Sequence, residues 1–385
     1  MNALMWGNGV YHYTKTLVIT LFIPYLLSYG ISMSTIAMAK SINLSLSVIL
    51  SIPAGRFGDK YGSKKSILYA NLFLFCSIFC LLKPTVYSIF LSEILGGCAS
   101  AFYSGAYNAW LVSYSNEKNN IFAVYTENQK VFTLGMISAG ITSSLLYYDG
   151  LYVALCSFII IIGLFMMATD KNIVEEKVEI SMFALIKYFK SIMNMMVIST
   201  ILLLGVSEVI YHSWTLLFNQ SKLEFVQEDI GIILSTSLIL QFFVSYLFKK
   251  IELYKFAQVI PLCLFFCTLL SGLLVIGSDG FFIEKEYMMI SYGFFTALYS
   301  MTLTLFSSVT CQYLSHSGFK RSLINLLYTS GRMTGSILFC MIAYFHIDQA
   351  SHFWRLVPCC CLFILVILLL DKHSIVVRQK KIMMK

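Results

Sequence analysis

Charged residues are scarce in this sequence, so it lacks the polar surface that a water-soluble protein presents to solvent. Only 12% of the 385 residues are charged and 58% are hydrophobic, whereas soluble domains average about 25% charged and about 45–50% apolar residues. The sequence also has no low-complexity segment, no recognisable soluble domain and no P-loop pattern. These absences exclude an ordinary soluble enzyme and leave no room for an ATPase domain. We expect a protein that is embedded in a lipid bilayer and is not an enzyme.

The eleven cysteines lack the spacing of a metal site. There is no C-x-x-C pair and no Cys/His cluster with zinc spacing. Most of the cysteines lie inside long apolar runs, where a cysteine behaves as a small hydrophobic residue. No G-x-S-x-G or similar catalytic spacing is present either. We therefore expect no metal, no cofactor and no catalytic residues.

Long apolar runs are what the sequence has in abundance. A bilayer core about 30 Å thick requires roughly 20 apolar residues per helix, and twelve runs of about this length are separated by short polar breaks. The predicted spans are 6–29, 33–54, 66–83, 86–112, 131–148, 151–169, 193–217, 230–248, 257–277, 288–311, 323–344 and 353–371.

The basic residues predict the orientation of these spans, because lysine and arginine accumulate in cytoplasmic loops. With both ends of the chain inside, twenty of the 27 lysines and arginines fall in cytoplasmic segments. The longest polar connection, 170–191, divides the chain into six-helix bundles over 1–169 and 192–371, followed by a basic tail over 372–385. We therefore expect an all-α, multi-pass membrane protein with twelve transmembrane helices and both termini in the cytoplasm.

A glycine-rich and basic motif lies between the second and third spans. Glycines permit a tight turn between closely packed helices, and basic residues anchor to the inner leaflet. In full it reads Gly55-Arg56-Phe57-Gly58-Asp59-Lys60-Tyr61-Gly62-Ser63-Lys64-Lys65. This motif resembles the loop signature of the major facilitator superfamily, which implies a role in the conformational cycle for Gly55, Gly58, Asp59, Lys60, Gly62, Lys64 and Lys65.

Other stretches extend the resemblance over nearly the whole chain. Residues 104–111 look like a small-residue segment of the drug and metabolite efflux members, and residues 321–332 are similar to the start of their eleventh helix. The fifth span lacks the Gly-Pro and paired glycines of the antiporter signature. The resemblance implies a monomer of two six-helix bundles that rock around a midplane site, with helices 1, 4, 7 and 10 lining the cavity.

Ionisable side chains within the spans are few, and each costs about 2.5–3.5 kcal/mol at the bilayer centre on insertion scales. Glu208 and His212 are four residues apart and so share a helix face, with Tyr211 and Trp214 nearby. The resemblance places their helix at the cavity. A carboxylate in a low-dielectric site can exchange a proton as the cavity opens and closes, so Glu208 is the candidate for proton coupling. The alternative is a carboxylate permanently bonded to a neighbouring helix.

The remaining charged candidates have both functional and structural interpretations. His12 and Lys15 share one face of the first helix, and Lys15 could attract an anionic substrate group or neutralise Glu208 or Glu93 across the cavity. Alternatively, both residues could lie at the cytoplasmic interface. Glu93 is either a salt-bridge gate or a packing residue. Lys40 and Arg332 belong to helices that support the cavity, and we expect structural or gating ion pairs there.

Polar and aromatic residues complete the predicted substrate pathway. Tyr107 and Asn108 come from the fourth span, and Tyr292 and Tyr299 come from the hydroxyl-rich tenth span. Aromatic rings can surround a cation or stack on a planar compound. Their alternative roles are anchoring at the membrane interface and bonding between helices.

We therefore expect a secondary-active exporter of small amphipathic compounds, such as drugs, antibiotics or a self-made toxic product, coupled to protons in a bacterial inner membrane. Its expected partners are a small-molecule substrate, protons and the lipid bilayer, but not nucleic acid. Two alternatives remain open. One is an importer of a nutrient or an organic anion, and the other is a membrane receptor or scaffold that transports nothing.

Overall fold

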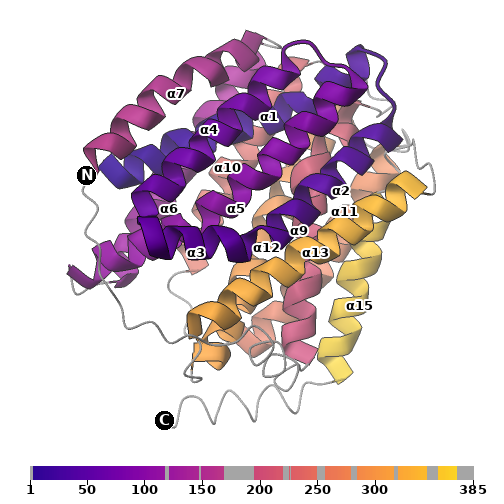
Figure 1. The fold of residues 1–385 in the computed structure, drawn as a ribbon. Helices are drawn as coiled ribbons and strands as arrows, with labels where there is room; N and C mark the ends of the chain where they lie inside the picture. The colour runs from indigo at the N-terminus through magenta and orange to yellow at the C-terminus, as the bar shows by residue number, and fades with distance from the viewer. Residues whose placement is uncertain are drawn as a thin grey trace. The chain divides into compact units, whose positions relative to one another are not determined.

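A computed structural model shows that the described part of the chain is built from α-helices (Figure 1). No strand occurs among these residues. Five of its helices are long and apolar enough to cross a membrane by length and composition alone. The count of twelve spans and the orientation stay predictions. The structure describes residues 3–117, 121–146, 149–168, 195–219, 225, 227–248, 256–278, 284–315, 320–344 and 354–370.

Each predicted apolar run coincides with a helix, although the ends differ by several residues. The largest difference is at α6, which begins ten residues before the predicted start of its span at 131. The helices before the central connection are α1 Ala3–Ser28, α2 Met33–Ile49, α3 Ser51–Tyr61, α4 Ser63–Leu81, α5 Val86–Glu117, α6 Ile121–Leu146 and α7 Gly150–Met167. Those after it are α9 Met195–Asn219, α10 Gln227–Phe248, α11 Phe256–Ser278, α12 Lys285–Ser315, α13 Lys320–Tyr344 and α15 Leu356–Leu370.

The second predicted span, 33–54, is wrong at its end. Helix α2 stops at Ile49, and a separate helix, α3, carries the glycine-rich motif. Pro53 explains the break, because a proline ring clashes with the carbonyl four residues earlier, here that of Ile49, and is tolerated in the first turn of a new helix. Gly55 and Gly58 therefore lie inside a helix and not in a turn. The turn itself is at Gly62, whose φ of 91° favours glycine.

The described chain divides into two compact units. Unit 1 contains residues 1–177, 226–235 and 339–348, and unit 2 contains residues 178–225, 236–338 and 349–385. In unit 1, α5 packs on α2 and α4, and α1 packs on α6 and α7. In unit 2, α11 packs on α12 and α15. The predicted domains and the 170–191 loop stay predictions, because that loop and the 372–385 tail lie outside the described residues.

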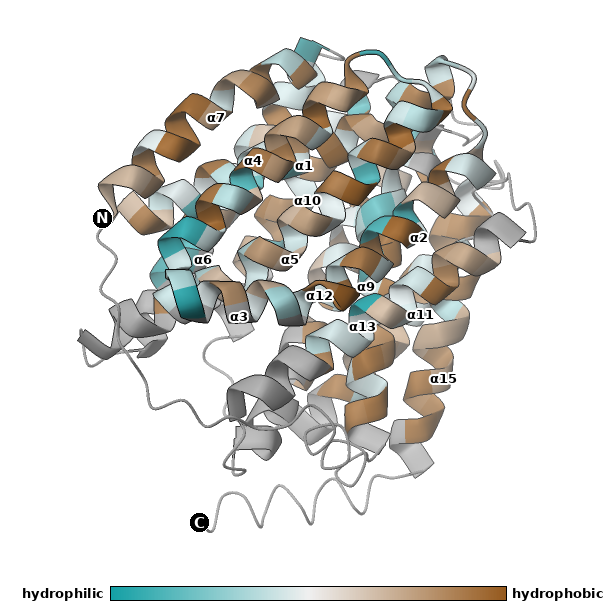
Figure 2. Ribbon diagram, viewed as in Figure 1, coloured by the Kyte–Doolittle hydropathy of each residue, from teal (hydrophilic) through white to brown (hydrophobic). Residues whose placement is uncertain are grey.

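Hydrophobic residues cover much of the outer helices, as expected for a lipid-facing surface. Helices α7 and α15 are mostly hydrophobic along their length, whereas α3 combines hydrophobic residues with strongly hydrophilic ones (Figure 2). Exposed side chains on α7 include Ile159 and Met167, each 78% exposed. Apolar side chains with this exposure are unfavourable in water but find an apolar solvent in lipid.

Glycines allow several helix pairs to approach until their backbones touch. A Cβ atom on Gly135 of α6 would overlap the carbonyl oxygen of Gly9 on α1. A Cβ on Gly97 of α5 would lie 2.7 Å from the carbonyl oxygen of Asn43 on α2. In unit 2, a Cβ on Gly205 of α9 would lie 2.7 Å from Thr334 Cγ2 on α13. Close packing of this kind replaces the hydrophobic effect, which gives no attraction between helices in lipid.

Candidate functional site

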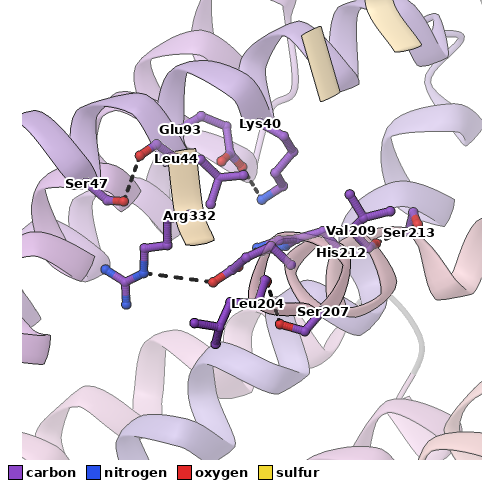
Figure 3. Close-up of polar contacts among 11 residues, drawn as sticks. Lys40, Leu44, Ser47, Glu93, Leu204, Ser207, Val209, His212, Ser213 and Arg332 are labelled. Carbon is purple, nitrogen blue, oxygen red and sulfur yellow. Dashed lines mark hydrogen bonds and ion pairs between the residues drawn. The ribbon is translucent and has the colours of Figure 1, made fainter. Parts of the chain in front are cut away.

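Glu208 lies near the middle of α9, in unit 2, between two basic side chains. Its Oε2 is 3.6 Å from Nε2 of His212, one turn further along the helix. Its Oε1 is 3.8 Å from Nε of Arg332 on α13, the contact drawn from Arg332 in Figure 3. Gly335 brings α13 close, since a Cβ there would lie 2.9 Å from Glu208 Cβ. The predicted Glu208–His212 pairing on one helix face is confirmed, and Arg332 joins it from another helix.

The contacts of Glu208 with its two basic neighbours are long. Both ion-pair distances exceed the usual range of a hydrogen bond, so these contacts rest on charge attraction more than on directional bonding. The Glu208 side chain is 25% exposed, and that of Arg332 is 27% exposed. The Glu208 carboxylate is therefore only partly buried within unit 2.

A second ion pair lies in unit 1. Its charged atoms are closer together and its side chains are more buried than those of the Glu208–Arg332 pair. Lys40 Nζ on α2 is 2.7 Å from Glu93 Oε1 on α5, and the two side chains are only 8% and 5% exposed (Figure 3). The ammonium group also lies 4.1 Å from the ring centroid of Phe22 on α1. Both charged residues were candidates in the sequence, but their pairing was not predicted. The pair joins helices of the same unit.

His12 and Lys15 lie near the middle of α1. Because α1 begins at Ala3, Lys15 is about 18 Å along the helix from its start at 1.5 Å per residue. Both side chains are half-buried. The His12 ring packs edge-on against Phe132 of α6, with centroids 4.3 Å apart. This placement favours the unit interior over the first turn of α1, where an interfacial lysine would lie. The expected role of both residues in the pathway stays a prediction.

A hydrogen-bonded network that the sequence analysis missed joins α1, α5 and α6. Tyr103 donates to Asn8 Oδ1 at 2.7 Å, and Asn8 Nδ2 donates to Asn128 Oδ1 at 3.1 Å. Tyr107 donates to the same oxygen of Asn128. The Tyr103 ring stacks on Tyr11, with centroids 3.6 Å apart and planes 3° apart. Of these residues, Tyr107 was a predicted site residue, whereas Asn8, Tyr103 and Asn128 were not.

The aromatic candidates of unit 2 pack into a buried cluster. Trp214 stacks on Tyr292, with centroids 5.8 Å apart, and Phe218 and Trp354 also contact the Tyr292 ring. Trp214 and Tyr292 are each 3% exposed. In this conformation they form part of a packed core, so a substrate contact there would require the cluster to open.

The two other predicted tyrosines of unit 2 have different surroundings. Tyr299 on α12 is buried and donates to the carbonyl oxygen of Leu203 on α9 at 2.7 Å, which is the interhelical bonding that was the alternative role. Tyr211 is half-buried, and its ring centroid is 5.2 Å from that of His212. Tyr211 therefore lies beside the charged centre, whereas Tyr299 joins two helices.

One residue of the glycine-rich motif, Lys64, connects the start of α4 to the end of α7. Lys64, in the first turn of α4, donates to the carbonyl oxygens of Met166 at 2.7 Å and Ala168 at 3.0 Å. It therefore caps the last turn of α7, where a cation is favourable, and the expected contact of the basic residues with lipid stays a prediction. Lys60 lies over the Tyr61 ring at 5.1 Å, and Lys65 is exposed. The side chains of two predicted site residues, Asp59 and Asn108, lie outside the part of the chain that the structure describes.

Within the described ranges, no group of three or more His, Cys, Asp or Glu side chains is placed to hold a metal ion. Each unit thus contains one carboxylate–cation pair, together with polar and aromatic contacts between its own helices. A membrane protein of this kind carries its ionisable groups where they line a pathway or pair with one another. Fold and site together define a multi-pass helical transporter.

The comparisons with known proteins agree with this class. The profile of the Major Facilitator Superfamily matches residues 4–370, and the chain belongs to that family. It is therefore a membrane transporter that works by alternating access. No curated protein sequence matches the chain.

Solved structures share the fold at low sequence identity. The nucleoside transporter NupG has a TM-score of 0.73 and 15% identity, over 96% of this chain and 98% of that one. A proton-dependent oligopeptide transporter has a TM-score of 0.72 and 12% identity, over 98% of each chain. A D-xylose-proton symporter has a TM-score of 0.70 and 12% identity, over 95% of each chain. At this identity the likeness concerns the fold alone.

Proposed function

We propose that the chain is a proton-coupled transporter that exports small amphipathic compounds and that Glu208 is its proton-binding carboxylate. The observation that carries this proposal is the position of Glu208, mid-helix and a quarter exposed, between His212 and Arg332 at ion-pair distances. A proton on Glu208 would remove its attraction for Arg332. Loss of that attraction weakens the contact between α9 and α13 and so favours a conformation in which this contact differs. Proton binding would drive the transport cycle in this way.

The preference for amphipathic compounds rests on aromatic rings beside polar groups in both units. The half-buried Tyr211 lies against His212, and Phe132 lies against His12. Such surfaces offer an apolar face together with a hydrogen-bonding group, as ligand sites commonly do. We also infer a monomer in a bacterial inner membrane.

A second candidate is proton-driven import of a polar solute. The Asn8–Asn128–Tyr103–Tyr107 network supplies amide and hydroxyl groups in unit 1, which suit a sugar, nucleoside or peptide better than an apolar drug. Similar structures include proteins described as a nucleoside transporter and a D-xylose-proton symporter. Because their identities are 15% and 12%, these likenesses do not decide the direction of transport.

The test compares the wild type with Glu208→Gln in an efflux-deficient bacterial host at matched membrane levels. We expect the wild type to raise resistance to at least one compound in a panel of antibiotics and dyes, and Glu208→Gln to lose that resistance. Glu127→Gln is the matched control, since Glu127 is an exposed carboxylate paired with Lys130 at 3.7 Å. Uptake of labelled nucleosides, dipeptides and sugars forms the second arm. Wild-type uptake without resistance would overturn export in favour of import.

A further inference from the structure

The Lys40–Glu93 ion pair is not explained by stability alone. Moving an ion from water into a protein interior costs several kcal/mol even after relaxation, and buried pairs can often be replaced by hydrophobic residues without loss of stability. Both side chains are more than nine-tenths buried. The attraction between the two ions is therefore largely offset by the cost of removing them from water. We infer that the pair has a role other than stability.

The carboxylate of Glu93 is only half satisfied. Lys40 contacts Oε1, while Oε2 is buried and has no hydrogen-bond partner among the residues that the structure describes. A carboxylate normally accepts bonds at both oxygens, and a buried acceptor without a donor is costly. The ionised form of Glu93 therefore depends on one described contact, the ammonium group of Lys40.

Few other charged groups lie near Glu93. At this level α4 contributes Ser77, which bonds Ser92 beside Glu93 at 3.0 Å, and α1 contributes the Phe22 ring on which Lys40 rests. The helices packed against α5 carry further described titratable groups. The uncharged ones are Tyr61 on α3 and Tyr69, Cys76 and Cys80 on α4, and the charged ones are Lys60 on α3, Lys64 and Lys65 on α4, and Glu127 and Lys130 on α6. The charged ones lie in the last turn of α3, the first turn of α4 and the first half of α6.

The backbone beside the pair is a fixed crossing point. One turn beyond Glu93, a Cβ on Gly96 would lie 2.7 Å from Asn43 Nδ2 and a Cβ on Gly97 would lie 2.7 Å from the Asn43 carbonyl oxygen. Asn43 itself is three residues beyond Lys40. A change in the crossing angle at this point would separate the charges while the backbones stay in contact.

Unit 2 repeats this arrangement. Glu208 follows Gly205 by three residues, Arg332 follows Gly331 by one, and both glycines lie at the close contact of α9 and α13. Each unit therefore places a carboxylate–cation pair within one turn of a glycine crossing. The pair in unit 2 is the looser of the two, at 3.8 Å against 2.7 Å.

We propose that Glu93 is a second proton-binding carboxylate, which takes up a proton when the α2–α5 crossing changes and Lys40 leaves it. The step is balanced: one solvent proton adds to the Glu93 carboxylate, Lys40 keeps its ammonium proton, and the site changes from neutral to a net charge of +1. Return of Lys40 releases the proton. This inference rests on the proposed function only in that the transport cycle moves protons, and it gives each unit its own proton site.

The test is infrared difference spectroscopy of the purified full-length protein in lipid nanodiscs, transferred between alkaline and acidic buffer. Protonation of a carboxylate creates a carbonyl stretching band. We expect two carboxyl contributions in the wild type, with one lost in Glu93→Gln and the other lost in Glu208→Gln. Glu127→Gln is the control and should leave both in place. Helical circular dichroism and gel filtration verify that each variant is folded.

Lys40→Gln provides the second variant, in case Glu93→Gln does not fold. Without Lys40, proton uptake at Glu93 no longer requires an ammonium group to leave, so the contribution of Glu93 to the difference spectrum should differ from that in the wild type. A spectrum unchanged by both Glu93→Gln and Lys40→Gln would overturn the inference and identify the pair as structural. Loss of a band in Glu93→Gln but not in Glu208→Gln would instead overturn the proposed role of Glu208 while keeping that of Glu93.

Discussion

Replacing the cation by methionine should affect the two ion pairs very differently. Lys40→Met leaves the buried Glu93 carboxylate without its partner, and breaking a buried pair in this way costs about 3–5 kcal/mol. Arg332→Met removes a looser contact, at 3.8 Å with both side chains about a quarter exposed, and partly solvated pairs contribute about 0–1 kcal/mol. The same substitution therefore tests whether burial decides the strength of each pair.

The expected shift can be worked out from the length of the chain. At about 2.1 cal/mol/K of unfolding entropy per residue, a chain of 385 residues shifts its Tm by roughly 1–2 °C per kcal/mol. Lys40→Met should thus lower the Tm by roughly 3–10 °C, and Arg332→Met by no more than about 2 °C. The assay is loss of helical circular dichroism on heating the purified protein in detergent.

A double variant separates the charge effect from a general loss of packing. Lys40→Met combined with Glu93→Leu removes both charges and keeps a similar volume, so the Tm should recover most of the loss. Equal shifts for Lys40→Met and Arg332→Met would refute the reasoning from burial. So would a double variant no more stable than Lys40→Met alone, because the uncompensated charge would then not be the cause.

Three further predictions concern packing and the loop motif. Gly135→Val should sharply reduce the yield of folded protein, because its side chain would overlap the backbone of Gly9. Gly163→Val should be tolerated, since nothing lies within 4 Å of a Cβ there. Fluorescence-detected gel filtration measures the yield of both variants. Lys64→Ala should free the end of α7, costing about 1.5–3 kcal/mol for bonds to a charged donor, and limited proteolysis should then cut faster after that helix. Asp59→Asn should impair transport while membrane insertion, measured by immunoblot of washed membranes, stays normal; full transport would contradict the assignment of the motif.

Most of the fold was predictable because the bilayer dictates the length and apolarity of each helix. The break between α2 and α3 was also visible in the sequence, since Pro53 stands four residues after Ile49. It was missed because the apolar run continues to residue 54, and hydropathy does not register the clash of a proline ring. The early start of α6 was missed because the polar residues 126–130 separate its apolar first five residues, 121–125, from the apolar run that begins at 131.

Local pairs in the site were predictable, and long-range ones were not. Glu208 and His212 are four residues apart on one helix, so their contact follows from helix geometry alone. The partners Lys40 and Glu93 are 53 residues apart in the chain, and nothing in a single sequence says which helices are neighbours. Asn128 escaped notice because it lies just outside the predicted span, although the Asn8 amide inside an apolar run was a signal that a polar partner had to exist.

The aromatic cluster of unit 2 gives the molecule an internal optical probe. The chain has four tryptophans. Trp214 and Trp354 are buried in this cluster, at 3% and 0% exposure, and Trp110 is buried in unit 1 at 4%. Trp6 is 42% exposed. Intrinsic fluorescence is therefore weighted toward the dry interior of unit 2, and opening of that cluster to water would shift the emission to the red. A titration of candidate solutes could be followed in this way without a label and before any transported compound is known.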